Sequence, residues 1–120
     1  MIHLYGIPNC DTVKRARAWL DGQGIVYRFH DFKKEGVPAE ALARWMAALG
    51  WEALVNRRGT TWRQLDEATR EGVVDVDSAA RVLTANPSLV KRPVVEWAGG
   101  QKVTAGFDAP SWPALAARGG

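Results

Sequence analysis

The sequence predicts an α/β fold in which two strand-containing segments flank a helical one. Three observations lead to this prediction: apolar residues alternate near both ends of the chain, they recur at helical spacing between them, and glycine and proline separate the segments. With 120 residues, 47% of them hydrophobic, the chain can build one hydrophobic core and hardly more. It contains no run of 18 apolar residues, so we expect no membrane span.

The first third of the chain predicts a strand, a helix and a second strand. Residues 2–5 are apolar or amphipathic, and a turn at residues 6–9 follows them. From residue 11 to residue 20 the apolar positions have helical spacing, and residues 25–30 then alternate apolar and polar. A β-α-β unit of this kind crosses over right-handed, so we expect the two strands to be parallel.

The middle of the chain, roughly residues 33–90, is predicted to be helical. Pro38 suits the first position of an amphipathic helix that stops at Gly50. Thr60 or Thr61 is a candidate N-cap for another helix. A further helix is expected from near Asp77 to residues 86–87, where Asn-Pro stops it.

Strand character returns after this helical segment. Residues 93–97 and 101–104 flank Ala-Gly-Gly, which predicts a hairpin, and a short helix is expected after Asp108, before a loose end at residues 117–120. The order βαβ, helices, ββα is that of a thioredoxin-like core with an all-helical insert. The expected arrangement is one domain over residues 1–120, with the core at 1–32 and 91–120 and the insert at 33–90.

Cys10 is the only cysteine, and it falls where the loop after the first strand becomes a helix. Only a thiolate attacks disulfides or oxyanions, and a helix N-terminus favours an anion by about 0.3–1 kcal/mol. A second cysteine would stand three residues later, where the chain has Val13. An adduct on Cys10 must therefore be released by an external thiol, for which glutathione is the cytoplasmic candidate. The alternative is a buried structural cysteine.

Two arginine-containing segments are candidate partners of this thiol. A cis bond before Pro93 would turn the backbone of Arg92 towards the site, whereas a trans proline would simply begin an edge strand. The other segment is a basic cluster with Arg57 and Arg58, which suits carboxylates or oxyanions but is also common on solvated surfaces. The histidines lack neighbours at metal-ligand spacing, so no metal is expected.

Three blocks of sequence resemble the arsenate reductase-like (ArsC) family. They are Tyr-Gly-Ile-Pro-Asn-Cys-Asp-Thr at 5–12, Asn-Arg-Arg-Gly-Thr-Thr-Trp at 56–62 and Asn-Pro-Ser-Leu-Val-Lys-Arg-Pro-Val-Val at 86–95. The most similar branch is the YffB group of glutathione-dependent thiol reductases, with the Spx regulators as a sister branch. The resemblance implies a thioredoxin-like core with a helical insert. It also implies that Cys10 is the nucleophile and that Arg92 precedes a cis Pro93 beside it.

The chain departs from two patterns within this family. Glutaredoxin-linked arsenate reductases carry a histidine where this chain has Gly6, and they hold the oxyanion with three arginines. Arg92 matches one, the second aligns near Asn56, and the third falls around residues 105–106, where there is no cation. Spx regulators commonly carry Cys-x-x-Cys, in which Val13 replaces the second thiol. These departures favour a thiol reductase.

The sequence therefore predicts a cytoplasmic thiol reductase that uses glutathione as co-substrate and acts on a small thiol, disulfide or oxyanion. Cytoplasmic localisation is expected because the chain cannot form an internal disulfide and its first residues lack the pattern of a signal peptide. Glutaredoxin is a further candidate partner, and the net charge of +3 is too small to indicate nucleic acid. The alternative functions are a glutaredoxin-linked arsenate reductase and an Spx-like, non-catalytic regulator that binds RNA polymerase. The expected catalytic residues are Cys10 and Arg92, and the expected substrate- or glutathione-binding residues are Asn9, Asp11, Thr12, Arg57, Arg58 and Pro93.

Overall fold

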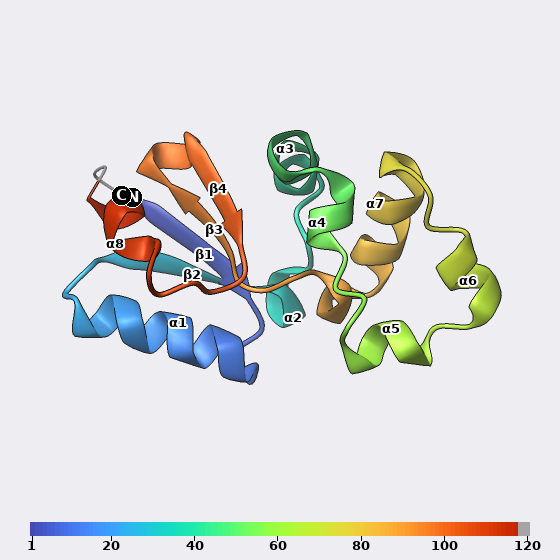
Figure 1. Ribbon diagram of the computed structural model, residues 1–120, viewed down its shortest axis with the longest axis horizontal. Coiled ribbons are helices and arrows are strands. Elements are labelled where there is room, and N and C mark those ends of the chain that lie inside the picture. Colours follow the sequence, from blue (N-terminus) through green and yellow to red (C-terminus); the bar gives the residue numbers. More distant parts are fainter. Residues whose placement is uncertain (118–120) are drawn as a thin grey trace. The chain divides into compact units, whose positions relative to one another are not determined.

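A computed structural model describes residues 1–117 and divides the chain into two compact units (Figure 1). The first, here called the core unit, combines residues 1–34 with the chain from residue 92 onward, and the second, the insert unit, comprises residues 35–91. The chain passes between the units at residues 34/35 and 91/92, which is two residues and one residue after the expected boundaries at 32/33 and 90/91. Residues 118–120, most of the end that was expected to be loose, lie outside the described residues.

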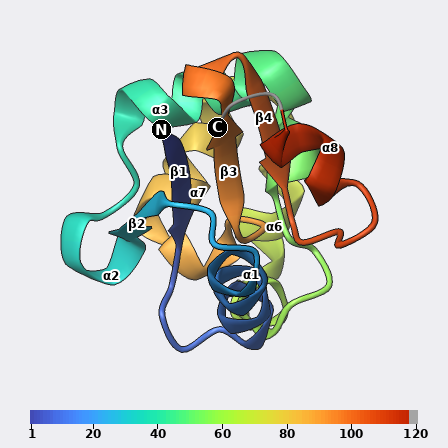
Figure 2. The ribbon, with the colours of Figure 1, turned by 90° about the vertical axis from the view of Figure 1, so that its left-hand side faces the viewer.

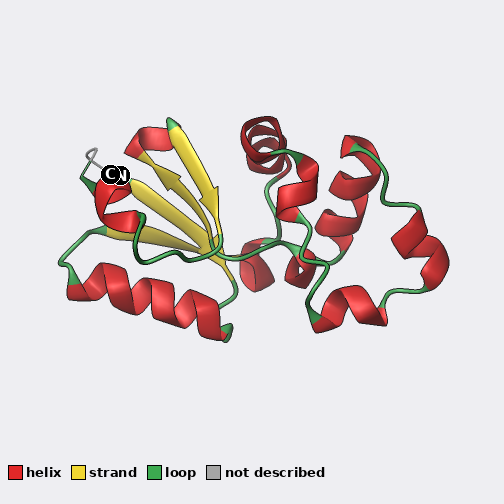
Figure 3. Cartoon of the chain, viewed as in Figure 1, coloured by secondary structure: helices red, strands yellow, loops and turns green. Residues whose placement is uncertain are grey.

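The core unit is built on a four-stranded mixed sheet, drawn in yellow in Figure 3, and its strand order is β2-β1-β3-β4. Strand β1 pairs with β2 in parallel, and β3 is antiparallel to both β1 and β4. The predicted β-α-β unit and the predicted hairpin are thus confirmed. The elements of this unit are β1 (Ile2–Gly6), α1 (Asp11–Gly22), β2 (Tyr27–Asp31), β3 (Val94–Trp97), β4 (Lys102–Ala105) and α8 (Trp112–Ala116).

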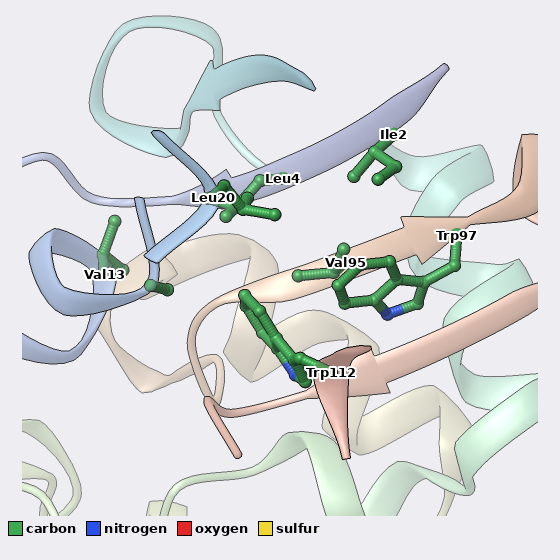
Figure 4. Packing of buried hydrophobic residues seen from close by; sticks show 8 residues of the cluster. Ile2, Leu4, Val13, Leu20, Val95, Trp97 and Trp112 are labelled. Atoms are coloured by element: carbon green, nitrogen blue, oxygen red, sulfur yellow. The ribbon is translucent and has the colours of Figure 1, made fainter. Parts of the chain in front are cut away.

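One face of this sheet carries the hydrophobic core of the unit, and helices α1 and α8 pack against it (Figures 2 and 4). Leu4 of β1 lies opposite Val95 of β3, and both side chains are fully buried. The apolar residues of α1 at helical spacing point to the same face, as the sequence pattern predicts. The core consists of Ile2, Leu4, Val13, Ala16, Leu20, Val95, Trp97 and Trp112.

The insert unit is helical, as predicted. Its longest helices, α3 and α7, contact each other and the short helix α4, and an isolated bridge joins Val55 to Val90. The helices are α3 (Ala39–Leu49), α4 (Trp51–Leu54), α5 (Thr60–Gln64), α6 (Glu67–Glu71) and α7 (Val76–Ala85), followed by a 3₁₀ turn at Pro87–Leu89. The four-residue helix α2 (Phe32–Glu35) crosses the division between the units.

Several element boundaries differ from the predicted ones for local reasons. Strand β2 begins at Tyr27, after a turn in which the backbone N–H of Ile25 donates to the carbonyl of Leu20 (3.0 Å). Helix α5 begins at Thr60 itself, with Gly59 as its N-cap, so neither threonine caps it. No helix of the described residues is long and apolar enough to cross a bilayer.

Candidate functional site: the loop before helix α1

Cys10 is the N-cap residue of α1, with extended backbone angles (φ −89°, ψ 128°). Its own N–H donates to the carbonyl of Ile7 (3.2 Å), and its carbonyl accepts from the N–H of Lys14 (2.9 Å), so hydrogen bonds hold the residue on both sides. Cys10 is a free cysteine; the residue is partly buried and packs against the hydrophobic core. An N-cap side chain lies at the end of the helix where the first backbone N–H groups lack partners, which favours an anion there.

The position of a second cysteine is occupied by a core residue. Val13 is fully buried, and a Cβ atom placed on Gly6 would lie 2.8 Å from its Cγ2 atom. The end of β1 and the first turn of α1 therefore meet directly, with Val13 filling the space beside Gly6. Because Cys10 is the only cysteine, no intramolecular disulfide can form.

The Arg92–Pro93 peptide bond is cis, as the family resemblance implies. Tyr5 of β1 pairs with Val94 of β3, so continuing the antiparallel register places Pro93 beside Gly6, at the start of the loop that leads to Cys10. The carbonyl of Pro93 accepts from the N–H of Gly106 (2.9 Å), which ties this segment to the end of β4. Arg92 is half-buried, and its buried Nε forms no hydrogen bond with a described residue, although the residue has other interactions.

The carboxyl end of β2 contributes a cation that sequence analysis missed. Asp31 lies opposite Gly6 in the parallel register, and its Oδ1 accepts from the backbone N–H of Lys33 (2.8 Å). The Nζ of Lys33 donates to Oδ1 of Asn9 (3.4 Å), the residue before Cys10. The available signal was that parallel strands end at the same edge of a sheet, so a lysine just after β2 lies near the loop after β1.

The other expected site residues fall into two groups. Within the core unit, Asp11 is exposed in the first turn of α1, and Thr12 is half-buried with its Oγ1 3.5 Å from Nη2 of Arg15. Arg57 and Arg58 belong to the insert unit, in the turn between α4 and α5. Both are exposed: the guanidinium of Arg57 lies over the rings of two tryptophans, at 5.8 and 5.6 Å, and the N–H of Arg58 donates to the Asn56 side chain. The core unit thus gathers Asn9, Cys10, Asp11, Thr12, Arg92 and Pro93 at one end of its sheet, with Lys33 added.

The face of the sheet opposite the hydrophobic core carries a polar group of residues, here called the histidine cluster: His3, Tyr5, His30 and Glu96. Nδ1 of His3 lies 2.8 Å from Nε2 of His30, and the Tyr5 ring stacks on the His30 ring at 4.3 Å. The Tyr5 hydroxyl donates to Oε1 of the buried Glu96 (3.2 Å). Burial lowers the pKa of His3, and the neighbouring His30 lowers it further. No group of three or more metal-ligating side chains occurs among residues 1–117.

The sheet order β2-β1-β3-β4, with α1 after the first strand and α8 after the last, defines a thioredoxin-like protein with Cys10 at the start of its first helix. Comparison with known proteins makes the assignment more specific. Residues 5–115 match the ArsC family, and the chain belongs to that family.

Individual relatives are similar to most of the chain. The chain is 41% identical to an uncharacterized protein of Haemophilus influenzae over 114 residues, which cover 95% of this chain and 97% of that protein. It is 26% identical to the global transcriptional regulator Spx of Streptococcus mutans over 97 residues, covering 79% of this chain and 69% of Spx.

Solved structures are also similar along nearly the whole chain. The YFFB (PA3664) protein superposes with a TM-score of 0.89 at 43% identity, covering 96% of this chain and 98% of that one. An arsenate reductase (ArsC) related protein from Brucella melitensis gives a TM-score of 0.73 at 50% identity, covering 94% and 92% of the two chains. Arsenate reductase from Vibrio cholerae, at 20% identity, covers 95% and 96% of the two chains with a TM-score of 0.77 and shows the shared fold.

Proposed function

We propose that the protein is a thiol oxidoreductase in which Cys10 is the nucleophile and glutathione is the resolving thiol. The observation that carries this proposal is a free, partly exposed cysteine as the N-cap of α1, with Val13 in place of a second cysteine. The partial exposure of Cys10 supports an accessible thiol, and the absence of another thiol in the sequence calls for an external one. Membership of the ArsC family supports oxidoreductase chemistry at this position.

The proposed reaction consists of successive thiol–disulfide exchanges. The Cys10 thiolate attacks one sulfur of a disulfide R–S–S–R′, forms a Cys10–S–S–R bond and releases R′–S⁻, which takes a proton from water. A glutathione thiolate then attacks the R sulfur, releases the Cys10 thiolate and leaves the disulfide of glutathione with R. A second glutathione converts that disulfide into R–SH and glutathione disulfide. The substrate gains two electrons, and two glutathione molecules are oxidised to one disulfide.

Charged groups around the loop support binding of a negatively charged co-substrate. Glutathione carries two carboxylates, and in the core unit Lys33 and Arg92 lie at the end of the sheet that also carries the Cys10 loop. We propose that these cations bind the carboxylates, with Asn9, Asp11, Thr12 and the backbone at Pro93 lining the remainder of the site. Arg57 and Arg58, the other candidates from the sequence for binding a carboxylate, belong to the insert unit.

The experiment that tests this function compares wild type with Cys10→Ser. After incubation with glutathione disulfide, intact-mass spectrometry should show one glutathionyl adduct on wild type and none on the variant. Turnover is then measured with 2-hydroxyethyl disulfide, glutathione, glutathione reductase and NADPH. Loss of turnover in Cys10→Ser supports the proposal. Equal turnover of the two proteins, or no adduct on wild type, contradicts it.

Arsenate reduction is a second candidate, favoured by the 50% identity to a protein named as related to arsenate reductase. The same thiol would attack arsenic, and two glutathione molecules would reduce arsenate to arsenite with release of one water and formation of glutathione disulfide. Gly6 stands where the resemblance implies a histidine, and Val13 fills the space that such a side chain would need. We therefore expect slow turnover with arsenate, and rapid Cys10-dependent reduction would reverse the order of the two candidates.

A regulatory role is a third candidate, favoured by the identity with Spx. In that role the protein would bind RNA polymerase without turnover, and binding would not depend on Cys10. Equal capture of purified RNA polymerase by wild type and Cys10→Ser, together with no turnover in the disulfide assay, would favour this role over both enzymatic ones.

A further inference from the structure

A second candidate site lies at the free edge of the sheet, in a groove between α1 and β2. The groove has a volume of about 520 Å³ and is lined by Arg17 and Asp21 of α1, the loop at residues 24–26, and Tyr27 and Phe29 of β2. We call it the β2 groove. Arg17 stands seven residues after Cys10 along α1, about 10 Å along the helix axis, so the groove is separate from the loop described above.

The central feature of the β2 groove is an arginine whose guanidinium is already held in place. Its Cζ lies 4.0 Å from the centroid of the Phe29 ring and 6.0 Å from that of Tyr27. Its Nε–H donates to the Tyr27 hydroxyl (3.0 Å). A cation over an aromatic face is attracted to it, and a planar guanidinium stacks well there.

These contacts leave the two terminal nitrogens of Arg17 as the groups that can meet a ligand. Nε donates to the Tyr27 hydroxyl, and Cζ lies over the Phe29 ring. The terminal nitrogens form a fork that matches the two oxygens of a carboxylate. Because the side chain is ordered before a ligand arrives, less conformational entropy is lost on binding.

The rest of the lining favours a ligand that also has an apolar part. Val26 is 74% exposed, an unusually open position for a valine, and it borders the groove beside the partly buried Ile25 and Tyr27. Asp21 adds one acceptor to the same lining, which suits a ligand that also carries an N–H donor. A carboxylate, an apolar side chain and an N–H group occur together at the C-terminal residue of a peptide.

We propose that the β2 groove binds a carboxylate with an apolar group on its α-carbon, the chemistry of a peptide C-terminus or a free apolar amino acid. Arg17 receives the carboxylate, Val26 and the aromatic rings cover the apolar group, and Asp21 accepts from the N–H. This site does not involve Cys10, so its test and the test of the proposed function can fail independently of each other.

The test is an NMR titration of the ¹⁵N-labelled full chain with N-acetyl-phenylalanine. Saturable shifts of the Arg17 Nε–H signal and of backbone amides at residues 24–29 are expected. N-acetyl-phenylalaninamide, which lacks the carboxylate, should bind at least about tenfold more weakly, equivalent to about 1.4 kcal/mol. Titration with free phenylalanine distinguishes the two sources: tighter binding of the acetylated form indicates a peptide terminus, and tighter binding of the free form indicates an amino acid.

The matched variants are Arg17→Gln and Arg28→Gln, which each remove one positive charge. Arg28 is exposed on β2 and does not line the groove, so its variant should bind as wild type does. Arg17→Gln should lose binding, and Arg17→Lys, which keeps the charge without the fork, should bind several-fold more weakly. Equal weakening by Arg17→Gln and Arg28→Gln would indicate general charge attraction and overturn the proposal. So would the absence of saturable shifts in the wild type.

Discussion

Gly6 and Val13 are packed so closely that a Cβ atom on Gly6 would stand 2.8 Å from Cγ2 of Val13. Gly6 ends β1, and Val13 lies in the first turn of α1, so this contact closes the loop that carries Cys10. The space beside the loop is thus filled from within the core. The same contact accounts for two departures from related sequence patterns. Position 6 has no room for the histidine of the arsenate reductases, and position 13, where Spx regulators carry a second cysteine, is a buried core position.

We expect Gly6→Ala to destabilise the protein by about 1–3 kcal/mol, the usual cost of an extra methyl group in a packed core. The measurement is urea unfolding followed by circular dichroism. Gly22→Ala is the matched control, because beyond its chain neighbours and the backbone of its own helix no atom lies within 4 Å of the Cβ position at Gly22. That residue is within α1, so alanine should leave the stability unchanged or raise it by about 0.5–1 kcal/mol.

The same contact predicts coupling between the two positions. Val13→Ala alone should be destabilising, because it empties a fully buried site. In the double variant with Gly6→Ala, the smaller residue at position 13 makes room for the new methyl group, so the combined loss should be less than the sum by about 0.5–3 kcal/mol. Strict additivity of the two losses would show that the contact does not determine the cost.

Lys33→Ala tests the cation at the end of β2. Its Nζ contacts the Asn9 side chain beside Cys10. An exposed lysine that binds a carboxylate of glutathione contributes only modestly to the affinity. We expect the KM for glutathione in the disulfide assay to rise about two- to fivefold, with kcat little changed. Lys34→Ala, which removes a neighbouring exposed lysine, is the control and should keep the wild-type KM. A similar increase in both variants would argue against a specific role for Lys33.

His3 predicts a pH dependence of stability. Burial, followed by the effect of His30, holds the pKa of His3 below its ordinary value of 6.5. The unfolded chain therefore takes up a proton at a higher pH than the folded one, so the free energy of unfolding falls as pH decreases from about 6.5 through the lowered pKa. Urea unfolding across this range measures the slope. His3→Gln should make the slope shallower, whatever its effect at neutral pH, and an unchanged slope would contradict the assignment.

Trp112 links α8 to the rest of the core through three edge-to-face contacts. Its ring centroid lies 4.9 Å from that of Trp97, 4.7 Å from that of Phe107 and 5.7 Å from that of Trp19. Trp112→Ala should cost about 3–5 kcal/mol in urea unfolding, because it leaves a large cavity in the core. Trp112→Phe keeps a ring in the site and should lose clearly less. Equal losses would mean that the aromatic contacts contribute little.

The order of elements could be predicted from the sequence because each element has a local signature. The helical spacing of Val13, Ala16 and Leu20 indicated α1, and the Ala-Gly-Gly turn between two strand-like segments indicated the β3–β4 hairpin. Predicted boundaries were wrong where a hydrogen bond that the apolar pattern does not reveal sets them. An example is Ile25, whose N–H donates to the carbonyl of Leu20. Helix α6 was not predicted separately, since its five residues contain no buried side chain to produce a pattern.

Around Cys10, too, some features follow from the sequence and others only from the fold. The sequence by itself determined that there is one thiol, that it stands at the start of a helix, and that no second cysteine follows it. Only the tertiary structure decided that Tyr5, next to Gly6, pairs with Val94, next to Pro93, that Lys33 contacts Asn9, and that the histidine cluster forms on the other face of the sheet. These relationships depend on the register between strands that are distant in the chain, and register is set by packing across the whole sheet, which no local pattern records.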